Sequence, residues 1–184
     1  MVKKGRKWKI NFYICPDYSE LKYKKMINLI GVYECKVDTN GRLMFSSALK
    51  KQLLSVINDG FVIKRSVYRK CLELYPMGIW NKEIENVNKL NRFIEENNDF
   101  IRLFMVGVKI VELDGSGRLL IPKDLIKFVG IKKDIVLASA IDRIEIWDKE
   151  EYESEIQKRT PDFPDLAKKV MGRKDNLENK NAIP

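Results

Sequence analysis

The stretch that decides the fold is VYECKVDTNGRLMFSSALKKQL, residues Val32–Leu53, because the chain repeats it 76 residues later as VKIVELDGSGRLLIPKDLIKFV, residues Val108–Val129. Seven of the 22 aligned positions are identical, and four of the seven fall in the run Asp-x-x-Gly-Arg-Leu. Identities gathered in one short run are harder to obtain by chance than scattered ones. The middle of the chain therefore contains two copies of one structural unit.

Each copy reads as a strand, a tight turn, a second strand and a short helix. The strand before each turn is rich in β-branched or aromatic residues. Asp38 and Asp114 open the turns, where an aspartate accepts hydrogen bonds from backbone amides two or three residues later. Gly41 and Gly117 supply the positive φ that such turns need.

The segments after each second strand complete the unit. A hydroxyl of Ser46 or Ser47 can cap the first helix, and Pro122 suits the first turn of the second. Apolar residues at helical spacing between 79 and 104 predict one or two connecting helices. Two more strands close each copy, at residues 61–64 and 71–75 in the first and at 135–138 and 144–147 in the second.

These elements predict the fold class and the divisions of the chain. Each copy spans about 45 residues, which is too few to bury a core alone, so we expect the copies to intertwine. The result is an α+β, β-rich, pseudo-two-fold body with short helices outside. The expected divisions are a basic and flexible N-terminal extension (1–26), repeat 1 (32–79), a helical connector (80–107), repeat 2 (108–151) and a basic, frayed C-terminal tail (157–184).

The net charge of +9 is concentrated at the ends of the chain. Residues 1–26 carry eight basic and two acidic groups (+6), and residues 157–184 carry seven and four (+3). The segment 27–156 is therefore neutral, with 20 groups of each sign. Basic tails occur on nucleic-acid-binding proteins and on proteins that they only solubilise. Specific binding must come from charges segregated within the middle of the chain.

Composition excludes several classes of protein. The absence of histidine excludes Ser-His-Asp and Cys-His catalysis and every His-ligated metal site. Three widely spaced cysteines without a C-x-x-C pair indicate neither a zinc site nor a disulfide framework. No apolar run approaches the roughly 18 residues that cross a bilayer, and the apolar stretch near the start is too short for a signal peptide. We expect a cytoplasmic protein with no cofactor, metal, membrane partner or small-molecule substrate.

The double motif resembles the MraZ family of bacterial proteins, which belongs to the AbrB-like (SpoVT-AbrB) swapped-hairpin fold. The closing segments CLELYPMGIW (71–80) and IEIWD (144–148) match the same pattern, so the resemblance covers roughly residues 27–152. It implies a double swapped-hairpin β-barrel and a non-enzymatic, nucleoid-associated regulator of transcription. Such a protein binds double-stranded DNA with sequence specificity at the promoter of the division and cell-wall gene cluster, through directly repeated short boxes. The resemblance also implies a ring-shaped homo-oligomer.

The family's motif carries over residue by residue. In the first copy, Thr39-Asn40 stands where a basic residue commonly precedes the glycine. Such a basic residue is a candidate for a phosphate contact, and the first copy lacks it. The matching positions are Asp38, Gly41 and Arg42 in the first copy and Asp114, Gly117 and Arg118 in the second.

Arg42 and Arg118 are the residues on which we expect DNA recognition to rest. A guanidinium at the base of a hairpin can contact phosphate or the edge of a guanine in the major groove. The alternative is an ion pair with Asp38 or Asp114 that only braces the turn. Opening a Gly-containing turn already explains both aspartates, without a catalytic role. Further phosphate-contact candidates, each equally a solvated surface lysine, are Lys36, Lys50, Lys51, Lys109 and Lys123.

Two functions of different kinds remain open. The first is the DNA-binding regulator, and the second is a protein-interaction or scaffold module of the same fold, similar to an antitoxin. In the second, a tail of the chain folds onto a partner protein. Failure to retard any promoter fragment at low salt, together with a tight protein partner, would favour the second function.

Overall fold

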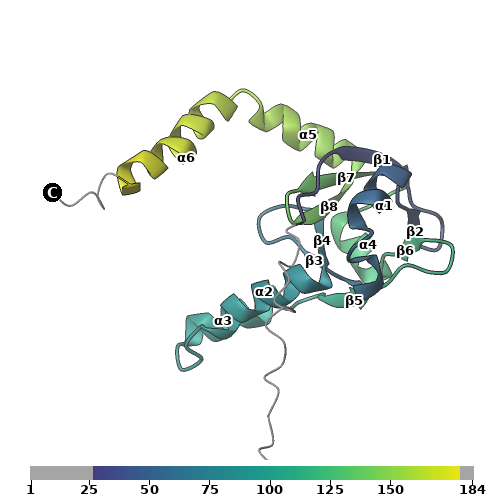
Figure 1. Ribbon diagram of the computed structural model, residues 1–184, viewed down its shortest axis with the longest axis horizontal. Coiled ribbons are helices and arrows are strands. Elements are labelled where there is room, and N and C mark those ends of the chain that lie inside the picture. The colour runs from purple at the N-terminus through teal and green to yellow at the C-terminus, as the bar shows by residue number, and fades with distance from the viewer. Residues whose placement is uncertain (1–26, 179–184) are drawn as a thin grey trace, which may run out of the picture.

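A computed structural model of the chain describes residues 27–178, and its arrangement is shown in Figure 1. The predicted extension 1–26 lies outside the described residues. The elements in chain order are β1 (Val32–Lys36), β2 (Arg42–Met44), α1 (Ser47–Leu53), the 3₁₀ turn η2 (Ile57–Asp59), β3 (Phe61–Arg65), β4 (Leu72–Pro76), α2 (Met77–Asn88), α3 (Glu95–Phe104), β5 (Lys109–Val111), β6 (Arg118–Leu120), α4 (Lys123–Val129), β7 (Asp134–Ala140), β8 (Arg143–Asp148), α5 (Lys149–Arg159) and α6 (Phe163–Glu178).

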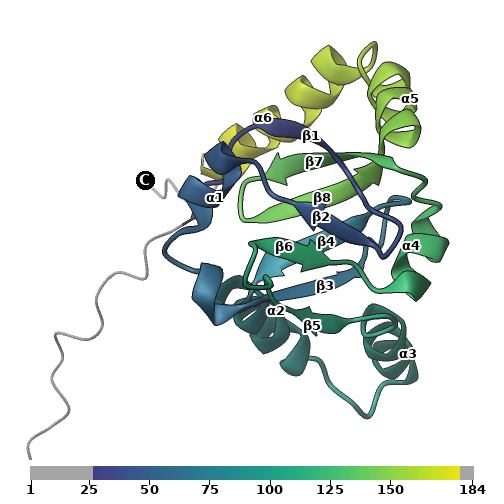
Figure 2. The same ribbon diagram turned by 90° about the vertical axis from the view of Figure 1, so that its right-hand side faces the viewer.

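Six strands form one sheet in the order β1-β7-β8-β4-β3-β5, and every neighbouring pair is antiparallel. The first strand of each copy pairs with a strand of the other copy, β1 with β7 and β5 with β3. Exchange of the two copies leaves the order unchanged, with the pseudo-two-fold axis between β8 and β4 (Figure 2). The two copies therefore intertwine, as their small size requires.

The remaining two strands, β2 and β6, form a separate antiparallel pair that we call the β2–β6 ribbon. Leu43 lies opposite Leu119 at its centre, and both are buried. Single bridges, Val37 with Leu43 and Leu113 with Leu119, join the ribbon to the first half of each hairpin. Because the strands of each hairpin separate after one bridge, the described strands form two separate sheets. The closed barrel predicted from the sequence is not confirmed, whereas the α+β, mostly antiparallel class is.

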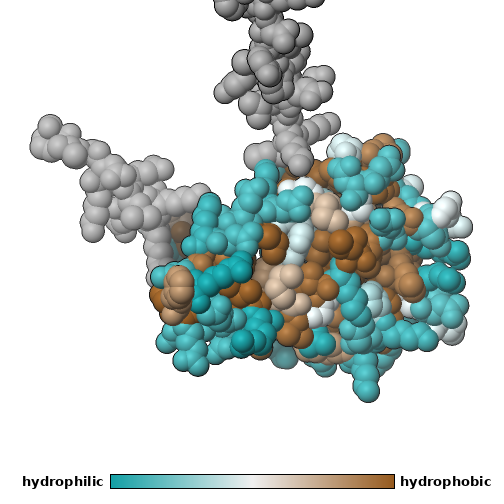
Figure 3. Space-filling model, turned by 90° about the horizontal axis from the view of Figure 1, so that it is seen from below, coloured by the Kyte–Doolittle hydropathy of each residue, from teal (hydrophilic) through white to brown (hydrophobic). Residues whose placement is uncertain are grey.

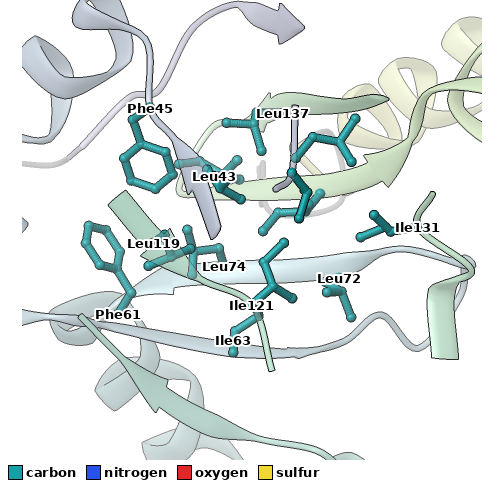
Figure 4. Packing of buried hydrophobic residues seen from close by; sticks show 14 of the residues in the cluster. Leu43, Phe45, Phe61, Ile63, Leu72, Leu74, Leu119, Ile121, Ile131 and Leu137 are labelled. Carbon is teal, nitrogen blue, oxygen red and sulfur yellow. The ribbon is translucent and has the colours of Figure 1, made fainter. Parts of the chain in front are cut away.

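The main core fills the space between the ribbon and the larger sheet. Figure 4 shows Leu43 and Leu119 of the ribbon close to Leu74 of β4. Phe45 and Phe61 meet edge to face in the same core, with ring centroids 6.2 Å apart. The ribbon is thus held against the sheet by buried apolar side chains.

The short helices α1 and α4 form where the sequence predicts them. Ser46 caps α1, since its Oγ accepts a hydrogen bond from the backbone N–H of Leu49 at 3.2 Å. Pro122 precedes α4 directly, as its fixed φ favours. The buried faces of the two helices also agree with the predicted spacing and consist of Leu49, Leu53, Leu125 and Val129.

Longer helices cover the other face of the six-stranded sheet. Trp80 of α2 packs on Tyr75 and stacks on Phe104 of α3, each with a centroid distance of 5.8 Å. In the other half, Tyr152 of α5 packs edge to face on Trp147, 5.9 Å away. Both tryptophans are buried. The predicted connector thus contains two helices, α2 and α3.

The frayed C-terminal tail expected from the sequence is wrong for residues 157–178. Asp148 caps α5 by accepting a hydrogen bond from the N–H of Glu150 at 3.2 Å. Pro164, which favours a loop in the sequence, stands in the first turn of α6, where its missing N–H breaks no helical hydrogen bond. Figure 1 shows α6 extending away from the sheets.

Candidate nucleic-acid interface

The two Asp-x-x-Gly-Arg turns are built by the same bonds. Asp38 Oδ1 accepts hydrogen bonds from the backbone N–H groups of Asn40 and Arg42, both at 2.8 Å. Gly41 closes this turn with a φ of +87°. The backbone N–H of Arg42 is the main cause that lowers the pKa of Asp38, and the positive charges of Arg42 and Arg118 lower it further. Asp38 is therefore an ionised acceptor that holds the turn.

The second turn repeats this pattern. Asp114 Oδ1 accepts from the N–H groups of Ser116 and Arg118 at 2.9 and 3.0 Å, and Gly117 has a φ of +72°. The backbone N–H of Arg118 is again the main cause of a lowered pKa at Asp114. In both copies the motif therefore stabilises the turn itself. It also fixes the backbone position from which each arginine side chain extends.

The β2–β6 ribbon directs the arginines outward because side chains alternate across a strand. With Leu43 and Leu119 facing the core, their neighbours face solvent. Arg42 lies opposite Leu120, and Met44 lies opposite Arg118. At each end of the ribbon, the exposed face therefore carries one arginine with an apolar side chain opposite it on the neighbouring strand.

The two arginines differ in their partners. Arg118 Nε lies 2.9 Å from Asp114 Oδ2, and the two side chains are 40% and 37% exposed. Among the side chains of residues 27–172, which the structure describes, none forms an ion pair or hydrogen bond with the guanidinium of Arg42. The bracing ion pair considered above is therefore present in the second copy, whereas the exposed Arg42 is available to a ligand.

The lysines singled out from the sequence do not gather at one place. Lys36 and Lys109 lie on β1 and β5, the opposite edge strands of the larger sheet. Lys36 Nζ is 3.8 Å from Asp134, and Lys109 Nζ is 2.5 Å from Asp124. Lys123 is exposed at the start of α4. Of these lysines, the structure pairs Lys36 and Lys109 with carboxylates.

Sequence reasoning overlooked two members of the exposed ribbon face, Met44 and Leu120. They are 44% and 49% exposed. The signal was present in the sequence, since the strands Arg42–Met44 and Arg118–Leu120 alternate around a single buried leucine. The ribbon thus offers methyl and methylene groups as well as positive charge.

Other kinds of site find little support in residues 27–178. No cluster of three or more Cys, Asp or Glu side chains there could hold a metal ion. Burial raises the pKa of Cys35 to about 11 and of Cys71 to about 12, so both thiols stay protonated near neutral pH. None of the described helices is both long enough and apolar enough to span a membrane.

Comparison with known proteins agrees with these features. Residues 29–103 and 104–173 each match the sequence profile of the family described as "MraZ protein, putative antitoxin-like". A protein of Christiangramia forsetii named "Transcriptional regulator MraZ" is 62% identical over 150 residues, covering 82% of this chain and 97% of its own length. A protein of the same name from Flavobacterium psychrophilum is 57% identical over 147 residues, covering 80% and 94%.

A third protein named "Transcriptional regulator MraZ", from Phocaeicola vulgatus, is 33% identical over 154 residues, covering 83% of this chain and 99% of its own length. The two profile matches together cover the region in which the two intertwined copies lie. On these matches, and on the double motif described above, the chain belongs to the MraZ family.

Proposed function

We propose that this protein is a transcriptional regulator, without catalytic activity, that binds double-stranded promoter DNA through the exposed face of the β2–β6 ribbon. The observation that carries the proposal is the Arg42 guanidinium, which is exposed and has no protein partner in the described chain. The relatives named as transcriptional regulators support the same function. Activity at a promoter places the protein in the cytoplasm, on the nucleoid.

The geometry of the ribbon suits the major groove, which admits a two-stranded β-ribbon. An arginine at the edge of such a ribbon can donate two parallel hydrogen bonds to O6 and N7 of guanine. Met44 and Leu120, exposed beside the arginines, can contact the methyl group of thymine. The ribbon therefore combines the two kinds of contact that distinguish base pairs.

Affinity has a second source in the charge at the ends of the chain. Residues 1–26 carry a net charge of +6, whereas residues 27–156 are neutral. Lysine and arginine side chains that neutralise DNA phosphates release counterions, so binding weakens as the salt concentration rises. We assign nonspecific affinity mainly to the tails and sequence discrimination to the ribbon.

The proposal includes a ring-shaped homo-oligomer that engages directly repeated boxes, as the family resemblance implies. A head-to-tail contact needs two different complementary surfaces on each copy. An apolar groove of about 370 Å³ lies between α3 and the end of α4, with Phe100, Leu103 and Phe128 exposed in it. On α6, Phe163, Leu166 and Val170 are exposed on one helical face. Figure 3 shows hydrophobic residues gathered between hydrophilic ones on the lower face of the molecule.

Titration of promoter DNA tests the function. Arg42→Ala should weaken binding to a cognate promoter duplex by about 1–3 kcal/mol, the usual value of a bidentate arginine–guanine contact. On a scrambled duplex the loss should be much smaller. Arg92→Ala is a matched control, because Arg92 lies between α2 and α3 and bonds to Asn88 Oδ1. Equal losses on both duplexes would restrict Arg42 to phosphate contact, and no binding by the wild type would refute the function.

A protein-interaction module of antitoxin type is the second candidate function. The apolar groove beside α3 favours it, because exposed aromatic side chains are common at protein interfaces. Under this alternative the purified protein fails to retard promoter fragments at low salt and binds a partner protein tightly. Retardation of the promoter that is lost in Arg42→Ala would decide for the regulator.

A further inference from the structure

Each Asp-x-x-Gly-Arg turn lies beneath the short helix of the other copy, at equivalent positions. A Cβ added to Gly41 would lie 2.8 Å from Ile126 Cδ1 of α4. A Cβ added to Gly117 would lie 2.7 Å from Lys50 Nζ of α1. Lys50 and Ile126 are 76 residues apart, the same offset that relates the two copies. One turn is therefore covered by a methyl group and the other by an ammonium group.

Among the side chains that the structure describes (residues 27–172), none forms an ion pair with the Lys50 ammonium. Lys50 Nζ lies 3.1 Å from the sulfur of Met44. Met44 is the residue opposite Arg118 in the ribbon. The ammonium and the Arg118 guanidinium therefore flank the same turn, at the same end of the ribbon.

The local charges of the two turns differ in consequence. In the first turn the charges of Asp38 and Arg42 cancel. In the second, Asp114 pairs with Arg118 through Nε, which leaves the two terminal nitrogens of that guanidinium without a partner in the described chain. Lys50 adds a further unit of positive charge beside them. The second turn thus has a net charge of +1, and its N–H donors without a described partner belong to partly exposed side chains.

From this asymmetry, and resting on the proposed function, we propose that Lys50 and Arg118 form a binding site for one backbone phosphate of the DNA. An ammonium acts as a compact charge on a phosphate, and a guanidinium adds directed hydrogen bonds. The Asp114 ion pair fixes the guanidinium beside the turn. This end of the ribbon holds the backbone, while the opposite end, with its unpaired Arg42, reads base edges.

The assignment gives the pseudo-symmetric ribbon a direction. A ribbon with two equal ends would bind equally well in either orientation on DNA. A ribbon that grips a phosphate at one end and reads bases at the other has one preferred orientation. Such a subunit suits directly repeated boxes, which all face the same way along the duplex.

The exchange of the two equivalent residues tests the site. Lys50→Ile places over the second turn the residue type that Ile126 places over the first. It should reduce the magnitude of the slope of log K against log[salt] by about 0.9, the value of one phosphate contact. The affinity should fall by the same factor on cognate and scrambled duplexes. Ile126→Lys should increase the slope by a similar amount. Lys82→Ile, which removes an exposed charge from α2 on the other face of the six-stranded sheet, should leave the slope unchanged.

Replacing single DNA phosphates with uncharged methylphosphonates identifies the phosphate that the site binds. Duplexes with a single methylphosphonate should weaken the wild-type complex several-fold at one position. At that position, the methylphosphonate should weaken binding of Lys50→Ile less than binding of the wild type, because only Arg118 remains to contact the phosphate. Thermal melts establish that each variant is folded, and added inorganic phosphate at constant ionic strength measures any competition by a free anion.

The outcomes separate this inference from the proposed function. An unchanged salt slope in Lys50→Ile, or an equal loss in Lys82→Ile, would overturn the phosphate site. If Arg42→Ala still lost affinity for the cognate duplex in that case, the proposed function would stand. Failure of the wild type to bind any duplex would remove both.

Discussion

Leu43 faces Leu119 across the centre of the β2–β6 ribbon, and the two side chains are 1% and 0% exposed. This contact joins the two copies at the middle of the molecule. It also determines the exposed face, since burial of these leucines turns the arginines beside them toward solvent. The residues that stabilise the fold and the residues that we propose to contact DNA therefore alternate along the same two short strands.

Truncation of Leu119 should destabilise the protein far more than truncation of its neighbour. Leu119→Ala opens a cavity in the core and should lower the free energy of unfolding by about 2–5 kcal/mol. Leu120→Ala is the matched control, because that side chain is 49% exposed and its loss should cost no more than about 0.5 kcal/mol. Urea melts of the three proteins make the comparison. Equal midpoints for the two variants would contradict the described orientation of the ribbon.

A methyl group at position 41 should be poorly tolerated. Gly41→Ala places its Cβ 2.9 Å from the backbone oxygen of Ile121, in a conformation with a φ of +87°. The left-handed conformation alone should cost about 1–2 kcal/mol. Gly115→Ala serves as the control, since nothing lies within 4 Å of its added Cβ. Thermal melts should show a lower midpoint for the first variant and little change for the second.

The aspartates of the two turns should lose their stabilising effect in acid. The backbone N–H groups of Arg42 and Arg118 lower the pKa of Asp38 and Asp114 from the ordinary value of 3.8. A lowered pKa in the folded state means that stability is present above 3.8 and is lost as the pH falls through the folded-state pKa. Carboxyl chemical shifts followed by NMR should therefore titrate below 3.8.

One variant tests whether the backbone N–H or the guanidinium of Arg42 is the main cause of the lowered pKa of Asp38. Arg42→Ala keeps the backbone N–H that bonds to Asp38, so the pKa of Asp38 should stay low in that variant. A return of that pKa to its ordinary value would show that the side-chain charge, and not the turn, lowers it.

The buried pair of Lys64 and Glu73 offers a test of charge burial. Lys64 is 1% exposed, and its Nζ lies 3.0 Å from Glu73 Oε2 and 4.6 Å from the ring centroid of Phe104. Glu73→Ala leaves the ammonium buried without its partner and should cost about 3–5 kcal/mol. Adding Lys64→Met should restore much of that loss. Additive losses in the double variant, measured by urea melts, would contradict coupling between the two side chains.

The sequence predicted the elements of the fold better than the connections between them. The motif, the helix caps and the buried helix faces were readable because each depends on residues close together in the chain. The pairing of β1 with β7 was not, since it joins segments about 100 residues apart. The closed barrel failed for a similar reason, because the point at which paired strands separate depends on packing across the whole core. The helix α6 was missed because Pro164 favours a loop as readily as a first helical turn.

The residues of the candidate site could be predicted from the sequence. The difference between the two arginines in their ion pairing could not. Arg42 and Arg118 occupy identical motifs, and no local rule says that only Arg118 pairs with its aspartate. The position of Lys50 over the second turn was also beyond local reasoning, since it depends on how the two copies interlock. The exchange of lysine for isoleucine at equivalent positions was nevertheless visible in the aligned repeats.

The cross-pairing of β1 and β5 bears on how the chain is made. During synthesis, β1 leaves the ribosome long before β7, the strand that completes its hydrogen bonds. An unpaired strand edge is prone to associate with other chains. The nascent first half is therefore an incomplete body, and its sheet can be completed only after β7 and β8 have been synthesised. A cut between α3 and β5 leaves two fragments that must find each other again before either regains its sheet.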